Sequence, residues 1–205
     1  MPDLQNDNAD ARVTRFVAQV RSRPWAFAAS RFLKKSRTRV GFILAAWCLG
    51  EGIYFRERPF ALAQPNAWVV IGLLLIASGL AFRFAALGCI RKKERLATCG
   101  VYSLCRHPLY LGSILLAYGF CTLLADAENF ILATVYFAVF YPLTILWEES
   151  RLADRYGEAY HGYRARTPML LPSGTFRTGE FTWHAAMSRG GALLLGAVLV
   201  LLASV

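Results

Sequence analysis

The chain has 205 residues, of which 56% are hydrophobic, and its mean hydropathy of +0.38 is higher than that of a soluble domain. Its 23 Lys and Arg residues against 13 Asp and Glu residues give a net charge of +10. A nucleic-acid-binding protein would spread this charge over a soluble surface, whereas here it lies in blocks between long apolar stretches. We therefore expect a membrane protein and no nucleic-acid partner.

The first 39 residues predict a polar start followed by a basic arm. Residues 1–10, MPDLQNDNAD, are acidic and polar, so they do not resemble a cleavable signal peptide. Hydrophobic residues then recur at helical spacing, at Val13, Phe16, Val17 and Val20. This pattern is typical of an amphipathic helix that lies on the membrane surface. A disordered basic tail is the alternative.

The rest of the chain, residues 40–205, is expected to form one membrane domain. A helix crosses the hydrocarbon core with about 20 mostly apolar residues. Five stretches are long and apolar enough, at residues 40–55, 67–87, 108–125, 130–147 and 185–205. We therefore predict an all-α polytopic membrane protein with about five transmembrane helices and an N-terminal amphipathic interfacial helix.

The distribution of basic residues predicts the orientation of these helices. Nine Lys and Arg residues precede the first apolar stretch, five lie within residues 91–106 and six within residues 151–189. Only two lie in the loop between the first and second stretches. Because cytoplasmic loops are rich in Lys and Arg, the N-terminus and both later basic segments should be cytoplasmic, with the C-terminus on the opposite side. In a bacterium this membrane would be the inner membrane.

The first segment with chemical information is GVYSLCRHPLYLGS, residues 100–113. Pro108 suits the first turn of the third span, which places Arg106 and His107 at the start of that helix. Unpaired backbone N–H groups and two cationic side chains there predict an anion site. Tyr110 offers a ring and a hydroxyl, and Gly112 allows close approach to the backbone. Alternatively, Arg106 only extends to lipid head groups.

The second segment follows the fourth span and begins with Glu148 and Glu149. Adjacent carboxylates at a bilayer surface need cationic partners, and the candidates are Arg106, Arg151, Arg155 and a positively charged ligand. A simple salt-bridge cluster is the alternative. Three tyrosines then recur at roughly helical spacing, and RTPMLLP, with two prolines, ends the segment. We expect a helix and a proline-rich loop that folds back over a pocket.

Together the two segments resemble a family of integral-membrane methyltransferases. The matching residues are Gly100-x-Tyr102-x-x-x-Arg106-His107-Pro108-x-Tyr110-x-Gly112, then Glu148-Glu149-x-x-Leu152, Tyr156-Gly157-x-x-Tyr160-x-x-Tyr163 and Arg166-x-Pro168-x-x-Leu171-Pro172. This pattern is similar to that of the isoprenylcysteine carboxyl methyltransferases, whose wider superfamily includes the phospholipid N-methyltransferases. The resemblance covers about a third of the chain, residues 100–172.

The resemblance implies S-adenosylmethionine as the cofactor, with S-adenosylhomocysteine as its product. The residues that it implies for cofactor binding are Arg106, His107, Pro108, Tyr110, Gly112, Glu148, Glu149, Tyr160, Met169, Leu170 and Leu171. Arg106 and His107 would bind the carboxylate of the cofactor, and Glu148 or Glu149 its ammonium or ribose hydroxyls. The adenine would contact Tyr110, Tyr160 and the 169–171 backbone. A Rossmann-type methyltransferase is not indicated, because no glycine-rich turn follows a strand pattern.

The expected acceptor is carried by a membrane lipid or a lipidated molecule, near an anionic lipid surface. For a head-group amine, such as that of phosphatidylethanolamine, Glu148 or Glu149 would act as the base. For an isoprenylcysteine-like carboxylate, Arg151 or Arg106 would orient the acceptor. The candidate catalytic residues are therefore Glu148, Glu149, Arg106 and Arg151.

The sequence leaves two other functions open, and it predicts no metal site. A membrane oxidoreductase similar to sterol reductases would bind a nicotinamide cofactor. A non-catalytic scaffold would use the Glu pair and Arg106 only to join helices. The five Cys residues include no Cys-x-x-Cys pair, so no metal site is expected.

Overall fold

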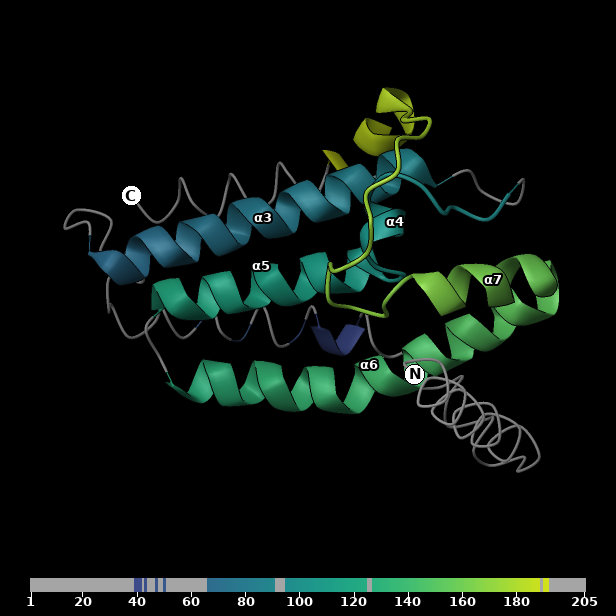
Figure 1. The fold of residues 1–205 in the computed structure, drawn as a ribbon. Coiled ribbons are helices and arrows are strands. Elements are labelled where there is room, and N and C mark those ends of the chain that lie inside the picture. The colour runs from purple at the N-terminus through teal and green to yellow at the C-terminus, as the bar shows by residue number, and fades with distance from the viewer. Residues whose placement is uncertain are drawn as a thin grey trace, which may run out of the picture.

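Figure 1 shows the fold in a computed structural model of the chain. The structure describes residues 66–90, 95–124 and 127–188, together with residues 190 and 191 and isolated positions between 39 and 50. The described ranges contain α3 (Ala67–Cys89), α4 (Val101–Leu104), α5 (Pro108–Leu124), α6 (Ala127–Tyr156) and α7 (Glu158–Arg166). Their β-structure is limited to one isolated bridge, between Gly100 and Arg177. The predicted all-α class is confirmed.

Three long helices, α3, α5 and α6, lie side by side with alternating directions (Figure 1). α3 and α6 are long and apolar enough to cross a membrane, and α5 is a shorter apolar helix. They correspond to the predicted spans 67–87, 108–125 and 130–147. The predicted spans 40–55 and 185–205 lie largely outside the described residues, and the amphipathic arm lies almost wholly outside them.

The helix that contains the fourth predicted span is longer than the span itself. α6 continues past residue 147 to Tyr156, so Glu148 and Glu149 stand on the helix itself. Pro142 lies inside this helix, so the backbone N–H that would bond to residue 138 is missing there. The polar end of α6 therefore extends in line with its apolar part and carries both carboxylates toward α7.

α3 and α5 approach closely through two pairs of glycines. A Cβ atom added to Gly79 would lie 2.7 Å from the carbonyl oxygen of Gly112, and one added to Gly119 would lie 2.9 Å from that of Gly72. Small residues at such crossings let helix backbones pack together in a membrane. The close approach that was expected at Gly112 is made by α3. Arg83 of α3 strengthens the same contact by donating to the Ser113 hydroxyl.

A glycine turn and the segment that follows α7 form the end of the molecule that holds α4 and α7. We call this segment, residues 167–177, the returning segment. Gly157 adopts a φ of +51°, a left-handed conformation that ends α6 and reverses the chain into α7. α7 ends at Arg166, shortly before Pro168. The chain then passes back across the start of α5 (Figure 1), where the N–H of Gly174 donates to the carbonyl of Leu104 at 3.0 Å.

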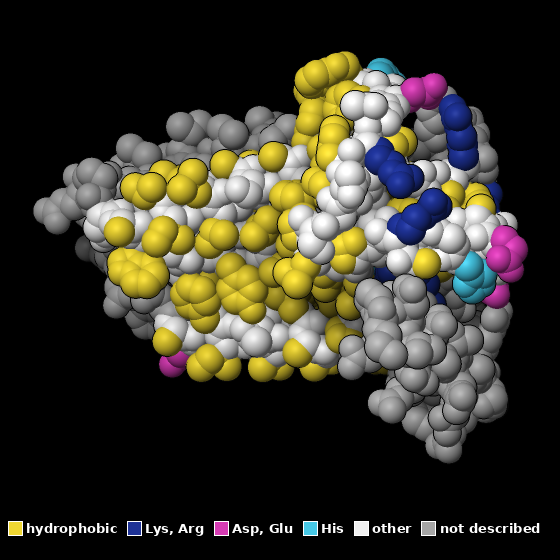
Figure 2. Space-filling model, viewed as in Figure 1, with side chains coloured by type: hydrophobic (Ala, Val, Ile, Leu, Met, Phe, Trp, Pro, Cys, Tyr) yellow, Lys and Arg dark blue, Asp and Glu magenta, His cyan; other side chains and the backbone are white. Residues whose placement is uncertain are grey.

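Polar and apolar side chains are separated along the helices. Figure 2 shows hydrophobic side chains over the long helices and most of the charged ones at the end where α7 lies. Large hydrophobic side chains are exposed along the helices, among them Trp68, Ile71, Leu74, Ile131 and Val135. Exposed apolar side chains of this extent are expected where helices face lipid.

The glycine contact predicts a stability defect. Gly79→Ala should lower the free energy of unfolding by about 1–3 kcal/mol, because its methyl group would collide with the backbone of α5. Thermal unfolding in detergent micelles, followed by circular dichroism, measures this change. Ser78→Ala, at an exposed neighbouring position, is the matched control and should leave the midpoint unchanged. Equal midpoints for both variants would contradict the close packing.

Candidate active site

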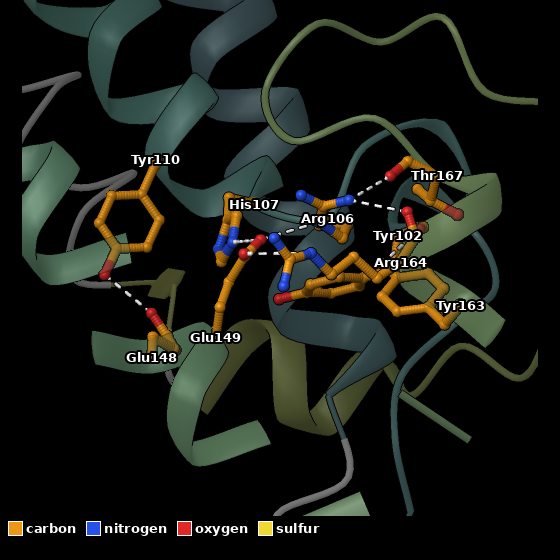
Figure 3. A network of polar contacts seen from close by, with 9 residues as sticks. All are labelled: Tyr102, Arg106, His107, Tyr110, Glu148, Glu149, Tyr163, Arg164 and Thr167. Atoms are coloured by element: carbon orange, nitrogen blue, oxygen red, sulfur yellow. Dashed lines mark hydrogen bonds and ion pairs between the residues drawn. The ribbon is translucent and has the colours of Figure 1, made fainter. Parts of the chain in front are cut away.

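The carboxylate of Glu149 lies at the centre of the charged end (Figure 3). Its side chain is only 5% exposed. Oε1 accepts a hydrogen bond from Nε of Arg106 at 2.9 Å and another from Nε2 of His107 at 3.2 Å. Nε of Arg164 lies 3.8 Å from Oε2. A buried carboxylate is stable only when cations and donors surround it, so this contact joins α6 to α7 and to the start of α5.

Arg106 also binds the returning segment. Its Nη1 donates to the carbonyls of Arg164 at 2.9 Å and Thr167 at 2.8 Å. The backbone N–H groups of Arg106 and His107 donate to the carbonyls of Pro168 and Met169, at 2.8 and 3.1 Å. The backbone donors just before α5, which the sequence indicated as an anion site, are therefore bonded to the chain itself.

Glu148 lies apart from this network. The hydroxyl of Tyr110 donates to its Oε2 at 2.8 Å (Figure 3). Glu148 lines a cavity of about 210 Å³, and it supplies the one carboxylate among the described lining residues. The aromatic and cationic side chains that share this cavity are Arg95, Tyr102, Arg106, His107, Tyr110, Tyr156 and Tyr163. The structure thus gives the two adjacent glutamates different surroundings.

A second cavity, of about 810 Å³, adjoins the first. The two share the lining residues Arg95, Leu96, Tyr156 and Tyr163. The larger one is also lined by Arg166 of α7 and by residues of the returning segment. The two cavities therefore adjoin each other near α4, α7 and the polar end of α6.

Two tyrosines of α7, Tyr160 and Tyr163, are buried close to this network. The hydroxyl of Tyr163 donates to the carbonyl of Tyr102 at 2.6 Å. Burial raises the pKa of Tyr163 above its usual value, so the phenol stays protonated and can donate. Tyr160 is fully buried, and burial together with the nearby Glu149 charge raises its pKa. Tyr160 lines neither cavity, so its expected contact with adenine is not supported.

Several other expected residues lie away from the cavities. Arg151 is exposed, and its guanidinium stacks 4.8 Å from the centre of the Trp147 ring. Pro108 is buried at the first position of α5, as expected for its role in starting the helix. Met169 and Leu171 are exposed, whereas Leu170 packs against the Tyr110, Tyr141 and Ile145 cluster. The 169–171 backbone therefore fastens the returning segment and does not line either cavity.

The structure adds residues that the sequence interpretation missed. Arg164 completes the cations around Glu149, and Arg95 lines both cavities. Tyr160, Tyr163 and Arg164 are spaced as i, i+3 and i+4, which places them on one face of a helix. That spacing was a usable signal for Arg164. Arg95 lies in a loop, where no periodicity indicates its position.

Among the described residues no group of three or more His, Cys, Asp or Glu side chains is arranged to hold a metal ion. The free thiols there are Cys89, Cys99, Cys105 and Cys121. Burial raises the pKa of the Cys105 thiol to about 11, which keeps it neutral beside the Arg106 and His107 pair.

Comparisons with known proteins indicate the family of the chain. The family model described as phospholipid methyltransferase matches residues 67–159. The cobalt-zinc-cadmium resistance protein CzcN of Cupriavidus metallidurans is 30% identical over 169 residues, which cover 78% of this chain and 75% of that protein. The nickel-cobalt-cadmium resistance protein NccN of Alcaligenes xylosoxydans is 35% identical over 96 residues, covering 45% and 43% of the two chains.

A eukaryotic relative connects the chain to an enzyme. The protein-S-isoprenylcysteine O-methyltransferase of Schizosaccharomyces pombe is 29% identical over 98 residues, covering 48% of this chain and 42% of that one. No solved structure matches. With α3, α5 and α6 as its apolar helices, the chain belongs to the integral-membrane methyltransferase superfamily that unites the phospholipid methyltransferases and the isoprenylcysteine O-methyltransferases.

Proposed function

We propose that the chain is an S-adenosylmethionine-dependent methyltransferase whose acceptor is carried by a membrane lipid. The observation that best supports this proposal is the separation of the two glutamates. Glu149 is bound to Arg106 and His107, whereas Glu148 faces a cavity. A scaffold that only joined helices would account for Glu149, but it would not account for a carboxylate that lines a cavity.

The residues around the two adjoining cavities have the chemistry that this cofactor requires. S-adenosylmethionine, when bound, supplies a methyl group on a positively charged sulfonium. The Glu148 carboxylate suits the positively charged sulfonium, and the rings of Tyr156 and Tyr163 suit an adenine. Arg106 already bonds to Glu149 and two carbonyls, so its expected contact with the cofactor carboxylate is not supported. The nucleoside needs the larger cavity, since about 210 Å³ is less than most ligand sites enclose.

Methyl transfer needs alignment more than covalent help from the protein. The Glu149 contacts fix the cavity walls, and the Tyr110 hydroxyl fixes the Glu148 carboxylate. An amine acceptor must lose a proton before it attacks, and Glu148 is placed to take it. The two cations expected to orient a carboxylate acceptor are not placed to do so, because Arg151 lies outside the cavities and Arg106 is occupied. The geometry therefore favours a lipid head-group amine over an isoprenylcysteine-like carboxylate.

The proposed site lies at the cytoplasmic surface of the membrane, which is the inner membrane in a bacterium. The basic segments predict this side, and the charged end in Figure 2 carries the cavities. A lipid acceptor would enter from the bilayer, and a water-soluble cofactor would enter from the cytoplasm. The excess of Arg at this end would attract an anionic lipid surface.

Substitution of the two glutamates should separate stability from activity. Glu149→Gln leaves Arg106 and Arg164 without their buried carboxylate, so the free energy of unfolding should fall by about 3 kcal/mol. Glu148→Gln should change that energy by less than about 1 kcal/mol but lower turnover at least about 100-fold. Thermal unfolding and methyl-transfer assays measure the two effects. A stable, inactive Glu149→Gln and an active Glu148→Gln would contradict the assignment.

Transfer of a labelled methyl group tests the proposed reaction. Purified protein is incubated with methyl-labelled S-adenosylmethionine and a total lipid extract, and the labelled product is identified by mass spectrometry. We expect label in an amine-containing phospholipid, with Glu148→Gln as the matched inactive control. A labelled carboxyl ester would show that the acceptor is a carboxylate and not an amine. No labelled lipid, with no calorimetric binding of S-adenosylhomocysteine, would contradict the proposed function.

A further inference from the structure

The larger cavity has a lining with a strong positive charge. Arg95, Arg166 and Arg177 line it, and no Asp or Glu is among its described lining residues. Thr98, Thr167 and Thr175 add hydroxyl groups to the same lining. All three guanidinium groups are exposed, and together they give this space a positive potential that attracts anions.

Arg177 is held in place through its backbone. The N–H of Gly100 donates to the carbonyl of Arg177 at 2.8 Å, and the N–H of Arg177 donates to the Ser103 hydroxyl at 2.8 Å. Gly100 has a φ of +62°, a conformation that favours glycine. The guanidinium forms no ion pair with any carboxylate in the described part of the chain. The fold therefore fixes the backbone of Arg177 at the rim of the cavity and leaves its exposed side chain charged.

The other two arginines are also available to a ligand. Nε of Arg166 donates to the carbonyl of Gly162 at 2.9 Å, which orients the side chain and leaves its two terminal nitrogens for an anion. Arg95 pairs with Glu180 at 3.3 Å, but both side chains are about two-thirds exposed. Such exposed pairs contribute little, so an anion in the cavity can replace Glu180.

We propose that Arg95, Arg166 and Arg177 form a binding site for a phosphate group. Arginine binds phosphate oxygens through two parallel N–H groups, and the surrounding hydroxyls supply further donors. A phosphate carries enough charge and enough acceptor oxygens to occupy all three arginines, whereas one carboxylate does not. The larger cavity, at about 810 Å³, has room for a phosphate group beside the part of the cofactor that enters it.

The phosphate site would select the methyl acceptor. The cavity that holds it shares Tyr156 and Tyr163 with the cavity that Glu148 lines. A head group whose phosphate is bound to the arginines can extend its other end past these tyrosines toward Glu148. This role rests on the proposed function, but the phosphate site itself does not. The phosphate comes either from a lipid head group or from a soluble phosphate compound.

Calorimetry on the full chain in an uncharged detergent tests the site with two probes. One is dihexanoyl phosphatidylethanolamine, which carries a lipid-borne phosphate, and the other is inorganic phosphate. Each is titrated into the unaltered protein, Arg166→Gln and Arg177→Gln. Arg155→Gln is the matched control, because Arg155 is exposed near the same end of α6 and lines neither cavity. S-adenosylhomocysteine is titrated into every variant as a second ligand.

Arg166→Gln and Arg177→Gln should each weaken phosphate binding about tenfold, and Arg155→Gln should not change it. Tighter binding of the lipid assigns the site to a head group, and tighter binding of inorganic phosphate assigns it to a soluble compound. Either result supports the phosphate site. Equal affinity in all variants, or no binding of either probe by the unaltered protein, would overturn it. Failure of S-adenosylhomocysteine alone to bind would refute the proposed function and leave the phosphate site intact.

Discussion

The buried carboxylate of Glu149 holds together parts of the chain that are far apart in sequence. Through Arg106 and His107 it fixes the start of α5, and through Arg164 it fixes α7. Arg106 then binds the carbonyls of the returning segment, which closes the charged end of the molecule. Removing two or three charges from water is costly, so the contact stabilises the fold only while every partner is present. The positions of the residues that form the cavity walls therefore depend on all partners of Glu149 being present.

Adjacent positions on a helix point about 100° apart, so neighbouring glutamates of α6 can have different surroundings. Glu149 points into the network and Glu148 faces the smaller cavity, where Tyr110 holds it (Figure 3). Because the Glu149 carboxylate holds α6 in place, the Glu148 carboxylate can face a ligand while the helix stays fixed. The glycine contacts between α3 and α5 extend this rigidity into the apolar part of the molecule, because they bring Arg83 against the first turns of α5.

The sequence predicted the helices better than the details of the site. Hydropathy located α3, α5 and the apolar part of α6, and the Arg106 and Glu149 motifs proved to be in contact. Hydropathy could not show that α6 continues through its charged residues, because apolar content decreases there while the helix does not end. Motif spacing also could not give the orientation of each side chain. Gly112 was therefore assigned to a ligand although it faces α3, and Arg151 was assigned to the site although it faces Trp147.

The central claim is that Glu149 holds the site together while Glu148 contacts the cofactor. An experimental structure of the protein with bound S-adenosylhomocysteine tests it most directly. We predict that the ligand lies in the two adjoining cavities and contacts Glu148, with Glu149 still bonded to Arg106 and His107. A structure in which Glu149 has left these partners to bind the ligand, or in which the ligand lies elsewhere, would contradict the account.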